Sequence, residues 1–273
     1  MGNNLEQRMQ NSANTPAQQR PTTLTDQIRS MESQFALAMP KGAEASQLVR
    51  DAITSLRQTP KLGECSPASV LGGLMTCAQL GLRPGVLGHA WLLPFYDSKS
   101  RQQQAQLVVG YQGLVELAHR SGKIQSLIAR TVYASDHFDV DYGLEDKLVH
   151  KPSMQGTKGD PIAYYAIAKF TTGGHAFYVM SHDEMVAYKE KNSKASKWGP
   201  WVDNFEAMAH KTCVRQLSKW MPKSTELSQA ISADESVRVD LHSEAINHPD
   251  HSSQPVDAHP EQIDAEVVEG EVA

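Results

Sequence analysis

The chain of 273 residues is poor in cysteine and has no long apolar run. Its three cysteines are widely spaced and form no C-x-x-C pair, which argues against a disulfide framework and a zinc knuckle. No stretch approaches the roughly 18 consecutive apolar residues of a membrane span, and the polar first residues lack the apolar core of a signal peptide. We therefore expect a soluble, cytoplasmic protein that has no membrane partner.

Nucleotide-binding and catalytic motifs are also missing. The chain contains no G-x-x-x-x-G-K-[ST] sequence, so it lacks the phosphate-binding loop of P-loop ATPases. Gly110 and Gly113 form only a lone G-x-x-G, a pattern more typical of turns and close packing. The sequence therefore predicts a protein that is not an enzyme and that needs no cofactor.

One stretch keeps an enzymatic alternative open. Acidic residues cluster between Asp136 and Asp146, near His137 and His150, and such a cluster could hold Mg²⁺ for phosphodiester cleavage. Its spacing matches no EF-hand loop, and a solvated strand end followed by a turn is the favoured interpretation. A metal-dependent DNA nuclease is thus the first alternative function, and a non-enzymatic adaptor without DNA affinity is the second.

The charge is divided unevenly along the chain. Residues 234–273 hold 11 acidic residues and one basic residue, whereas residues 1–233 hold 25 basic and 20 acidic residues. A basic body with an acidic tail is typical of polyanion binding that the tail regulates, although acidic tails also increase solubility. We expect the tail to compete with a bound polyanion or to recruit a partner, and its removal to preserve folding.

Hydrophobic periodicity divides the chain into three parts. Residues 1–23 and 234–273 are polar and aperiodic, which predicts a flexible N-terminal arm and a disordered acidic tail around a core at residues 24–233. Strand patterns are concentrated between His89 and Met180, with helical patterns before and after them. This order predicts an α+β fold in which a mostly antiparallel sheet is flanked by helices. The expected helices cover residues 24–39, 45–58, 66–80, 111–121, 182–192 and 203–221.

The most informative segment runs from Tyr188 to Lys223. It holds eight basic residues against three acidic ones, interleaved with five aromatic residues. Lys211, Arg215 and Lys219 stand four residues apart, so a helix places them on one face, which we expect to point outward. A basic groove with aromatic rings on which bases can stack is what sequence-tolerant binding of single-stranded nucleic acid requires.

Four blocks of sequence carry a resemblance to a known family. They read LGLRPGVLGHAWLLPF at residues 80–95, VGYQGLVELAHRSG at 109–122, YGLEDKLVHKP at 142–152 and GPW through Lys219 at 199–219. In this order they resemble the RecT family of bacteriophage single-strand annealing recombinases, over roughly residues 25–230. Gln112 and His119 depart from the pattern, because basic residues are expected at these places in relatives.

The resemblance implies an ATP-independent DNA recombination protein. Such a protein binds single-stranded DNA, assembles into homo-oligomeric rings or filaments, and anneals complementary strands into a duplex. Its implied partners are a phage 5′-to-3′ exonuclease and the host single-stranded-DNA-binding protein.

The expected DNA contacts combine the basic segment with this resemblance. Phosphates are assigned to Lys211, Arg215 and Lys219, with Lys194 and Lys197 as a mobile clamp. Three aromatic residues are either stacking surfaces or core and subunit contacts, namely Trp198, Trp201 and Tyr111. Four weaker candidates are expected on the side of the sheet, namely Arg83, His89, Arg120 and Lys169.

Overall fold

The computed structural model describes residues 23–192, 199–238 and 253–255. Three predicted features lie outside these described residues: residues 1–22 of the arm predicted at 1–23, the candidate contacts Lys194, Lys197 and Trp198, and most of the predicted tail.

The first part of the chain is helical. The helices are α2 (Leu24–Ser30), α3 (Glu32–Ala38), α4 (Ala45–Gln58) and α5 (Pro67–Leu80), with a 3₁₀ turn η1 (Leu62–Glu64) before α5. The single helix expected over residues 24–39 is divided at Met31 into α2 and α3. Helix α5 begins with Pro67 in its first turn and ends at Gly81, whose φ of 61° is the left-handed conformation that favours glycine.

Three antiparallel sheets follow. Strands β1 (Ala90–Asp97) and β2 (Gln102–Val109) form a hairpin, β3 (Ile124–Tyr133), β6 (Pro161–Phe170) and β7 (His175–Ser181) form a second sheet, and β4 (His137–Asp141) pairs with β5 (Lys147–Lys151). Because helices flank these antiparallel sheets, the predicted α+β class is confirmed. The acidic stretch 136–146 supplies β4 and the turn after it, as the favoured interpretation predicted.

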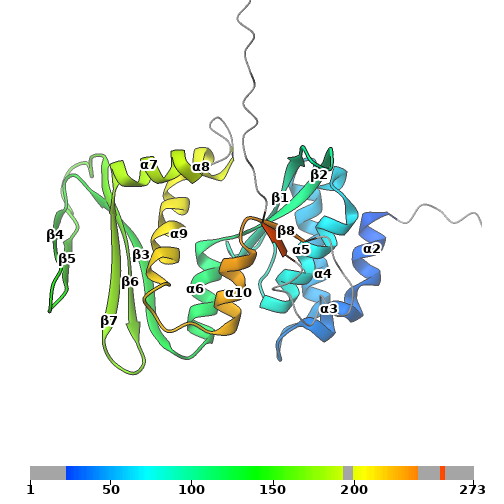
Figure 1. Ribbon diagram of the computed structural model, residues 1–273, viewed down its shortest axis with the longest axis horizontal. Helices are drawn as coiled ribbons and strands as arrows, with labels where there is room; N and C mark the ends of the chain where they lie inside the picture. The colour runs from blue at the N-terminus through cyan, green and yellow to red at the C-terminus, as the bar shows by residue number, and fades with distance from the viewer. Residues whose placement is uncertain (1–22, 193–198, 239–252, 256–273) are drawn as a thin grey trace, which may run out of the picture.

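Helices α6 (Tyr111–Arg120) and α10 (Thr225–Ala233) lie between two halves of the molecule (Figure 1). One half holds α2 to α5 with β1, β2 and β8 (Ser236–Arg238). The other half holds β3 to β7 with α7 (His182–Asn192), α8 (Pro200–Asp203) and α9 (Phe205–Leu217). Helix α9 packs along the sheet β3-β6-β7. The sequence predicted one helix over residues 203–221, whereas the chain breaks at Asn204 and α9 ends at Leu217.

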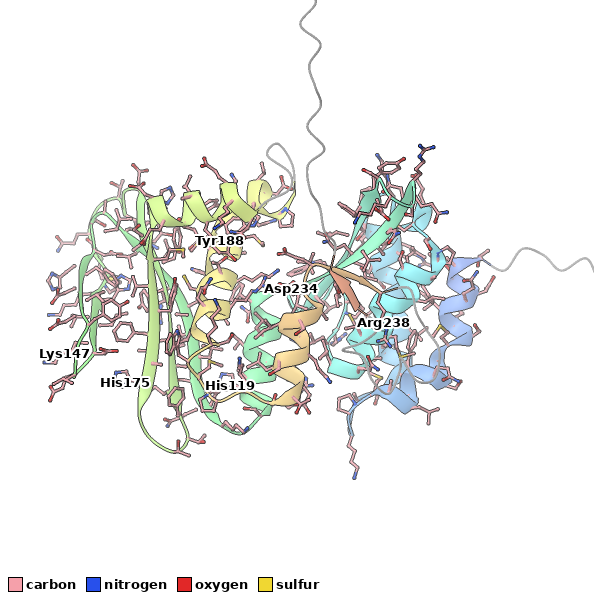
Figure 2. The ribbon with its side chains drawn as sticks, in the orientation of Figure 1. His119, Lys147, His175, Tyr188, Asp234 and Arg238 are labelled. Carbon is pink, nitrogen blue, oxygen red and sulfur yellow. The ribbon has the colours of Figure 1, made fainter. Side chains whose placement is uncertain are left out.

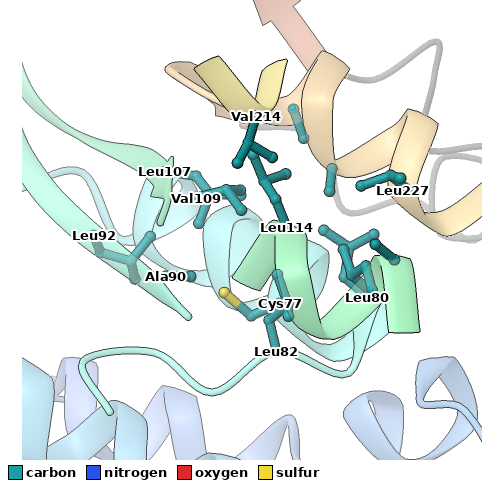
Figure 3. Packing of buried hydrophobic residues seen from close by; sticks show 14 of the residues in the cluster. Cys77, Leu80, Leu82, Ala90, Leu92, Leu107, Val109, Leu114, Val214 and Leu227 are labelled. Carbon is teal, nitrogen blue, oxygen red and sulfur yellow. The ribbon is translucent and has the colours of Figure 1, made fainter. Parts of the chain in front are cut away.

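The larger of two hydrophobic clusters among the described residues joins the two halves (Figure 3). Leu80 of α5, Leu114 of α6, Val214 of α9 and Leu227 of α10 are each at most 1% exposed and belong to one continuous cluster. The helices that carry the basic residues are therefore held in place by apolar packing of their buried faces, which is the main source of helix stability in proteins.

The folded core extends past its predicted end at residue 233. After α10, which the sequence analysis did not assign, strand β8 (Ser236–Arg238) pairs with β2, and a short strand β9 (Ser253–Pro255) pairs with β8. Arg238 is 2% exposed, and its Nη1 donates a hydrogen bond to Oε1 of Gln79 at 2.7 Å. Residues 234–238 therefore belong to the core, contrary to the predicted boundary of the tail.

Candidate nucleic-acid interface

Lys211 lies at the centre of a buried ion-pair cluster. Its Nζ donates to Oδ1 of Asp234 at 2.8 Å and to Oε1 of Glu235 at 3.3 Å. Nη1 of Arg215, one turn further along α9, donates to Oδ2 of Asp234 at 3.0 Å, and the backbone N–H of Val109 donates to Oδ1 at 2.9 Å. Asp234 therefore connects α9 with the end of β2, in the middle of the molecule (Figure 2).

Burial distinguishes this cluster from a surface ion pair. The side chains of Lys211 and Asp234 are 3% and 1% exposed. Burial raises the pKa of Asp234, whereas the positive charges of Lys211 and Arg215 lower it. Because Lys211 points inward to a carboxylate of its own chain, the prediction that it faces outward is wrong.

The three predicted phosphate ligands thus differ in accessibility. Arg215 keeps 31% of its side chain exposed while it pairs with Asp234. Lys219 is exposed, and its Nζ donates to Oε1 of Gln216 at 2.6 Å. Of the three, only Arg215 and Lys219 can reach a phosphate in this arrangement.

Arg215 borders a small cleft between α7 and α9. The cavity of about 120 Å³ is also lined by Tyr188 and Asn192 of α7, by Trp201 and by the buried Lys211. On α7, Nζ of Lys189 lies 5.6 Å from the centre of the Phe205 ring, and Lys191 is exposed. We call this region the α7–α9 cleft, and the chain continues from it into the segment that holds Lys194 and Lys197.

The predicted stacking residues within the described chain face inward. Trp201 is 7% exposed, and its ring packs against Tyr188 at 6.2 Å and Phe205 at 5.6 Å between ring centres. Tyr111 is half-buried, its ring centre lies 5.6 Å from that of His210 in an edge-to-face arrangement, and its hydroxyl accepts a hydrogen bond from Gln112. Trp201 is therefore a core residue, one of the two alternatives that the sequence left open.

Arg120 and Lys169 do not join the cleft. Arg120 donates to the carbonyl oxygen of Leu80 at 2.7 Å and pairs with Glu116 at 3.1 Å, so it caps the end of α5. Lys169 is exposed on β6, where it pairs in register with His175 of β7. The structure thus brings Arg215 to the same cleft as Tyr188 and Asn192 of α7, and Arg120 and Lys169 lie elsewhere.

An exposed tryptophan was missing from the predicted site. Trp220 is 76% exposed and lies just after α9. Lys219 precedes it, and Nζ of Lys123 donates to the carbonyl oxygen of Lys223 at 3.0 Å, which brings a third lysine to the same turn. We call these four residues, Lys123, Lys219, Trp220 and Lys223, the Trp220 surface.

The cluster behind the nuclease alternative has a structural role. Oδ2 of Asp136 accepts hydrogen bonds from the backbone N–H of Tyr133 at 2.9 Å and lies 3.0 Å from Nε2 of His150, while Oδ1 accepts from the N–H of Ser153 at 2.8 Å. The two backbone donors, followed by His150, lower the pKa of Asp136 to about 2. Across residues 23–192, 199–238 and 253–255, no group of three or more His, Cys, Asp or Glu side chains is arranged to hold a metal ion.

Comparison with known proteins identifies the class to which this chain belongs: the RecT family model matches residues 46–249. The chain is 43% identical to the protein RecT of Escherichia coli strain K12 over 210 residues, which cover 76% of this chain and 77% of that protein. It is also 26% identical to the uncharacterized protein YqaK of Bacillus subtilis strain 168 over 267 residues, covering 96% of this chain and 87% of YqaK.

The chain belongs to the RecT family. Membership implies single-stranded DNA binding and strand annealing in recombination, a function that is not enzymatic. The predictions of the family, the annealing function and the absence of enzymatic activity are thereby confirmed. In the described part of the chain, no helix is long and apolar enough to cross a membrane.

Proposed function

We propose that this chain anneals DNA by holding a single strand in the α7–α9 cleft. The observation that carries the proposal is that Arg215 stays partly exposed at a cleft that Tyr188 and Asn192 of α7 also line, and the same helix carries Lys189 and Lys191. Lys194 and Lys197 follow α7 in the sequence. These cations can follow a phosphate backbone without reading the bases, as sequence-independent binding requires.

Annealing follows from charge neutralisation and does not require bond chemistry. Two single strands repel each other through their phosphates, and cations that neutralise one backbone reduce this repulsion. If the phosphates of the bound strand face the cleft, its base edges remain free to test a second strand for complementarity. The product is then the annealed duplex, and no step consumes a nucleotide.

We further propose that the protein works in the cytoplasm as a homo-oligomer, in a ring or filament. A short cationic cleft binds few phosphates on its own, but repeated clefts along one strand increase the overall affinity by multivalency. The resemblance to phage recombinases supports a phage 5′-to-3′ exonuclease and the host single-stranded-DNA-binding protein as partners.

The salt dependence of DNA binding tests this proposal. If each protomer neutralises about four phosphates, the logarithm of the binding constant falls with the logarithm of salt concentration at a slope of about −3, because each phosphate of a single strand releases about 0.7 counterion. Fluorescence anisotropy of a labelled oligo(dT) measures the slope.

A matched pair of variants tests whether the salt dependence of DNA binding arises at the cleft. Lys191→Gln is expected to reduce the magnitude of the slope of log binding constant against log salt concentration by about 0.7. Lys147→Gln, an exposed lysine at the far end of the molecule on β5, is expected to leave it unchanged (Figure 2). A flat salt profile in the parent protein contradicts the proposal.

A further inference from the structure

Trp220 is held on the surface by the residues around it. Its backbone N–H donates to the carbonyl oxygen of Leu217 at 2.9 Å, which continues the last turn of α9. Leu217 and Met221 are 0% and 5% exposed, so both neighbours are anchored in the core while the indole between them remains 76% exposed. An aromatic side chain of this size buries a large apolar area when it gains a partner.

Lysines lie near Trp220 along the chain and in the segment that follows it. Lys219 and Lys223 stand one residue before it and three residues after it, and Lys123 reaches the same turn through its hydrogen bond to the Lys223 carbonyl. An ammonium group has three donors, so Lys123 can also contact a second acceptor. The nearby carboxylate of Glu226 has a lowered pKa because of hydrogen bonds from its own N–H and from Ser224, followed by the charges of Arg120 and Lys123.

We propose that the Trp220 surface is a second contact site for single-stranded DNA, in which a base stacks on the Trp220 indole while neighbouring phosphates bind Lys123, Lys219 and Lys223. The inference rests on the proposed function, because it assigns a further part of the same DNA path. Base stacking on an aromatic ring within a cationic surface is the recurring chemistry of sequence-tolerant single-strand binding.

The charge of this surface favours DNA over a protein partner. Three lysines lie around one aromatic residue, whereas lysine is depleted at the centre of protein interfaces. Lys219 also follows Arg215 by four residues and lies in the turn just after α9, so the Trp220 surface adjoins the C-terminal end of the helix that carries Arg215. The three lysines and the position of the Trp220 surface next to α9 both favour binding of one extended polyanion.

The test compares two oligonucleotides of equal length, oligo(dT) and an abasic strand that has the same phosphates but no bases. Trp220→Leu keeps an apolar side chain but removes the ring. We expect this variant to bind oligo(dT) at least about fivefold more weakly than the parent protein and to bind the abasic strand equally well. Trp220→Phe is expected to restore part of the affinity for oligo(dT), because it restores an aromatic face.

Trp91 provides the matched control, since it is 39% exposed and lies on β1 in the other half of the molecule. Trp91→Leu is expected to bind both strands as the parent does. Unchanged oligo(dT) binding by Trp220→Leu overturns the inference and leaves the proposed function intact. Equal weakening for both strands, together with a smaller oligomer in analytical ultracentrifugation without DNA, also overturns it and assigns Trp220 to a subunit contact. Failure of the parent to bind oligo(dT) contradicts the proposed function itself.

Discussion

Replacing Lys211 with alanine is expected to lower the free energy of unfolding by about 3–5 kcal/mol, because the change leaves a buried carboxylate with one of its two cations missing. Asp234 is 1% exposed and cannot compensate by contact with water. Urea denaturation of the variant and the parent measures the difference.

Lys219→Ala is the matched control, since it removes the same residue type from the region just after α9. Lys219 is exposed and bonds only to Gln216 among the contacts that the structure assigns to it, so its loss is expected to change the free energy of unfolding by at most about 0.5 kcal/mol. Equal effects of the two changes would contradict the buried ion-pair cluster.

Because Lys211 is buried and Lys219 is exposed, the two residues cannot be tested for DNA contact in the same way. From the sequence spacing alone, we would replace Lys211, Arg215 and Lys219 together by glutamate and expect little loss of stability. In the structure, a glutamate at position 211 would lie beside Asp234 in the core. Loss of DNA binding by that triple variant would therefore report unfolding, and only the exposed cations can be reversed without this ambiguity.

The second prediction concerns where the chain can be shortened. A protein that ends at residue 233 loses Asp234 and Arg238, which leaves Lys211 buried without its carboxylate and takes β8 away from β2. We expect it to lose at least about 3–5 kcal/mol and to lack the cooperative melting of the full chain. Circular dichroism against temperature measures this loss.

A protein that ends at residue 238 is the matched control. It keeps Asp234 and the pairing of β8 with β2. It lacks residues 239–273, which include the short strand β9 and hold nine acidic and no basic residues. We expect it to melt cooperatively and to bind oligo(dT) more tightly at low salt, because the tethered negative charge that competes with DNA is gone. Unchanged DNA binding would instead assign these residues to partner recruitment, and cooperative melting of the shorter protein would contradict the placement of residues 234–238 in the core.

Local sequence signals were sufficient for much of the fold. The start and end of α5 follow from Pro67 and Gly81, whose backbone preferences act within one turn of the helix. The hairpin of β1 and β2 follows from two apolar runs separated by a polar loop. Helix α10 was not predicted because it is only nine residues long and buries just three small or medium side chains.

Burial of charge could not be predicted in the same way. Lys211 and Asp234 are 23 residues apart, and Arg238 and Gln79 are 159 residues apart, so only the tertiary fold brings each pair together. Spacing along α9 correctly places Lys211 and Arg215 on one face, but it cannot tell whether that face meets solvent or another segment of the chain.

The burial of the tryptophans could not be predicted from the sequence either. Trp201 and Trp220 both lie in the basic segment, and composition treats them as equivalent. Trp201 is covered by Tyr188 and Phe205, whereas Trp220 follows the last turn of α9 and has an exposed ring. Pro222, which ends the helical pattern in the sequence, lies five residues after the end of α9 at Leu217.

The central claim is that this RecT family protein anneals complementary strands by binding them, without a nucleotide. The most direct measurement mixes two complementary oligonucleotides, labelled with donor and acceptor dyes, with the purified protein in a buffer that contains no ATP, and follows energy transfer over time. We predict that annealing proceeds well above the rate without protein and that a non-complementary pair gives no signal. No acceleration, or acceleration only after ATP is added, would contradict the account.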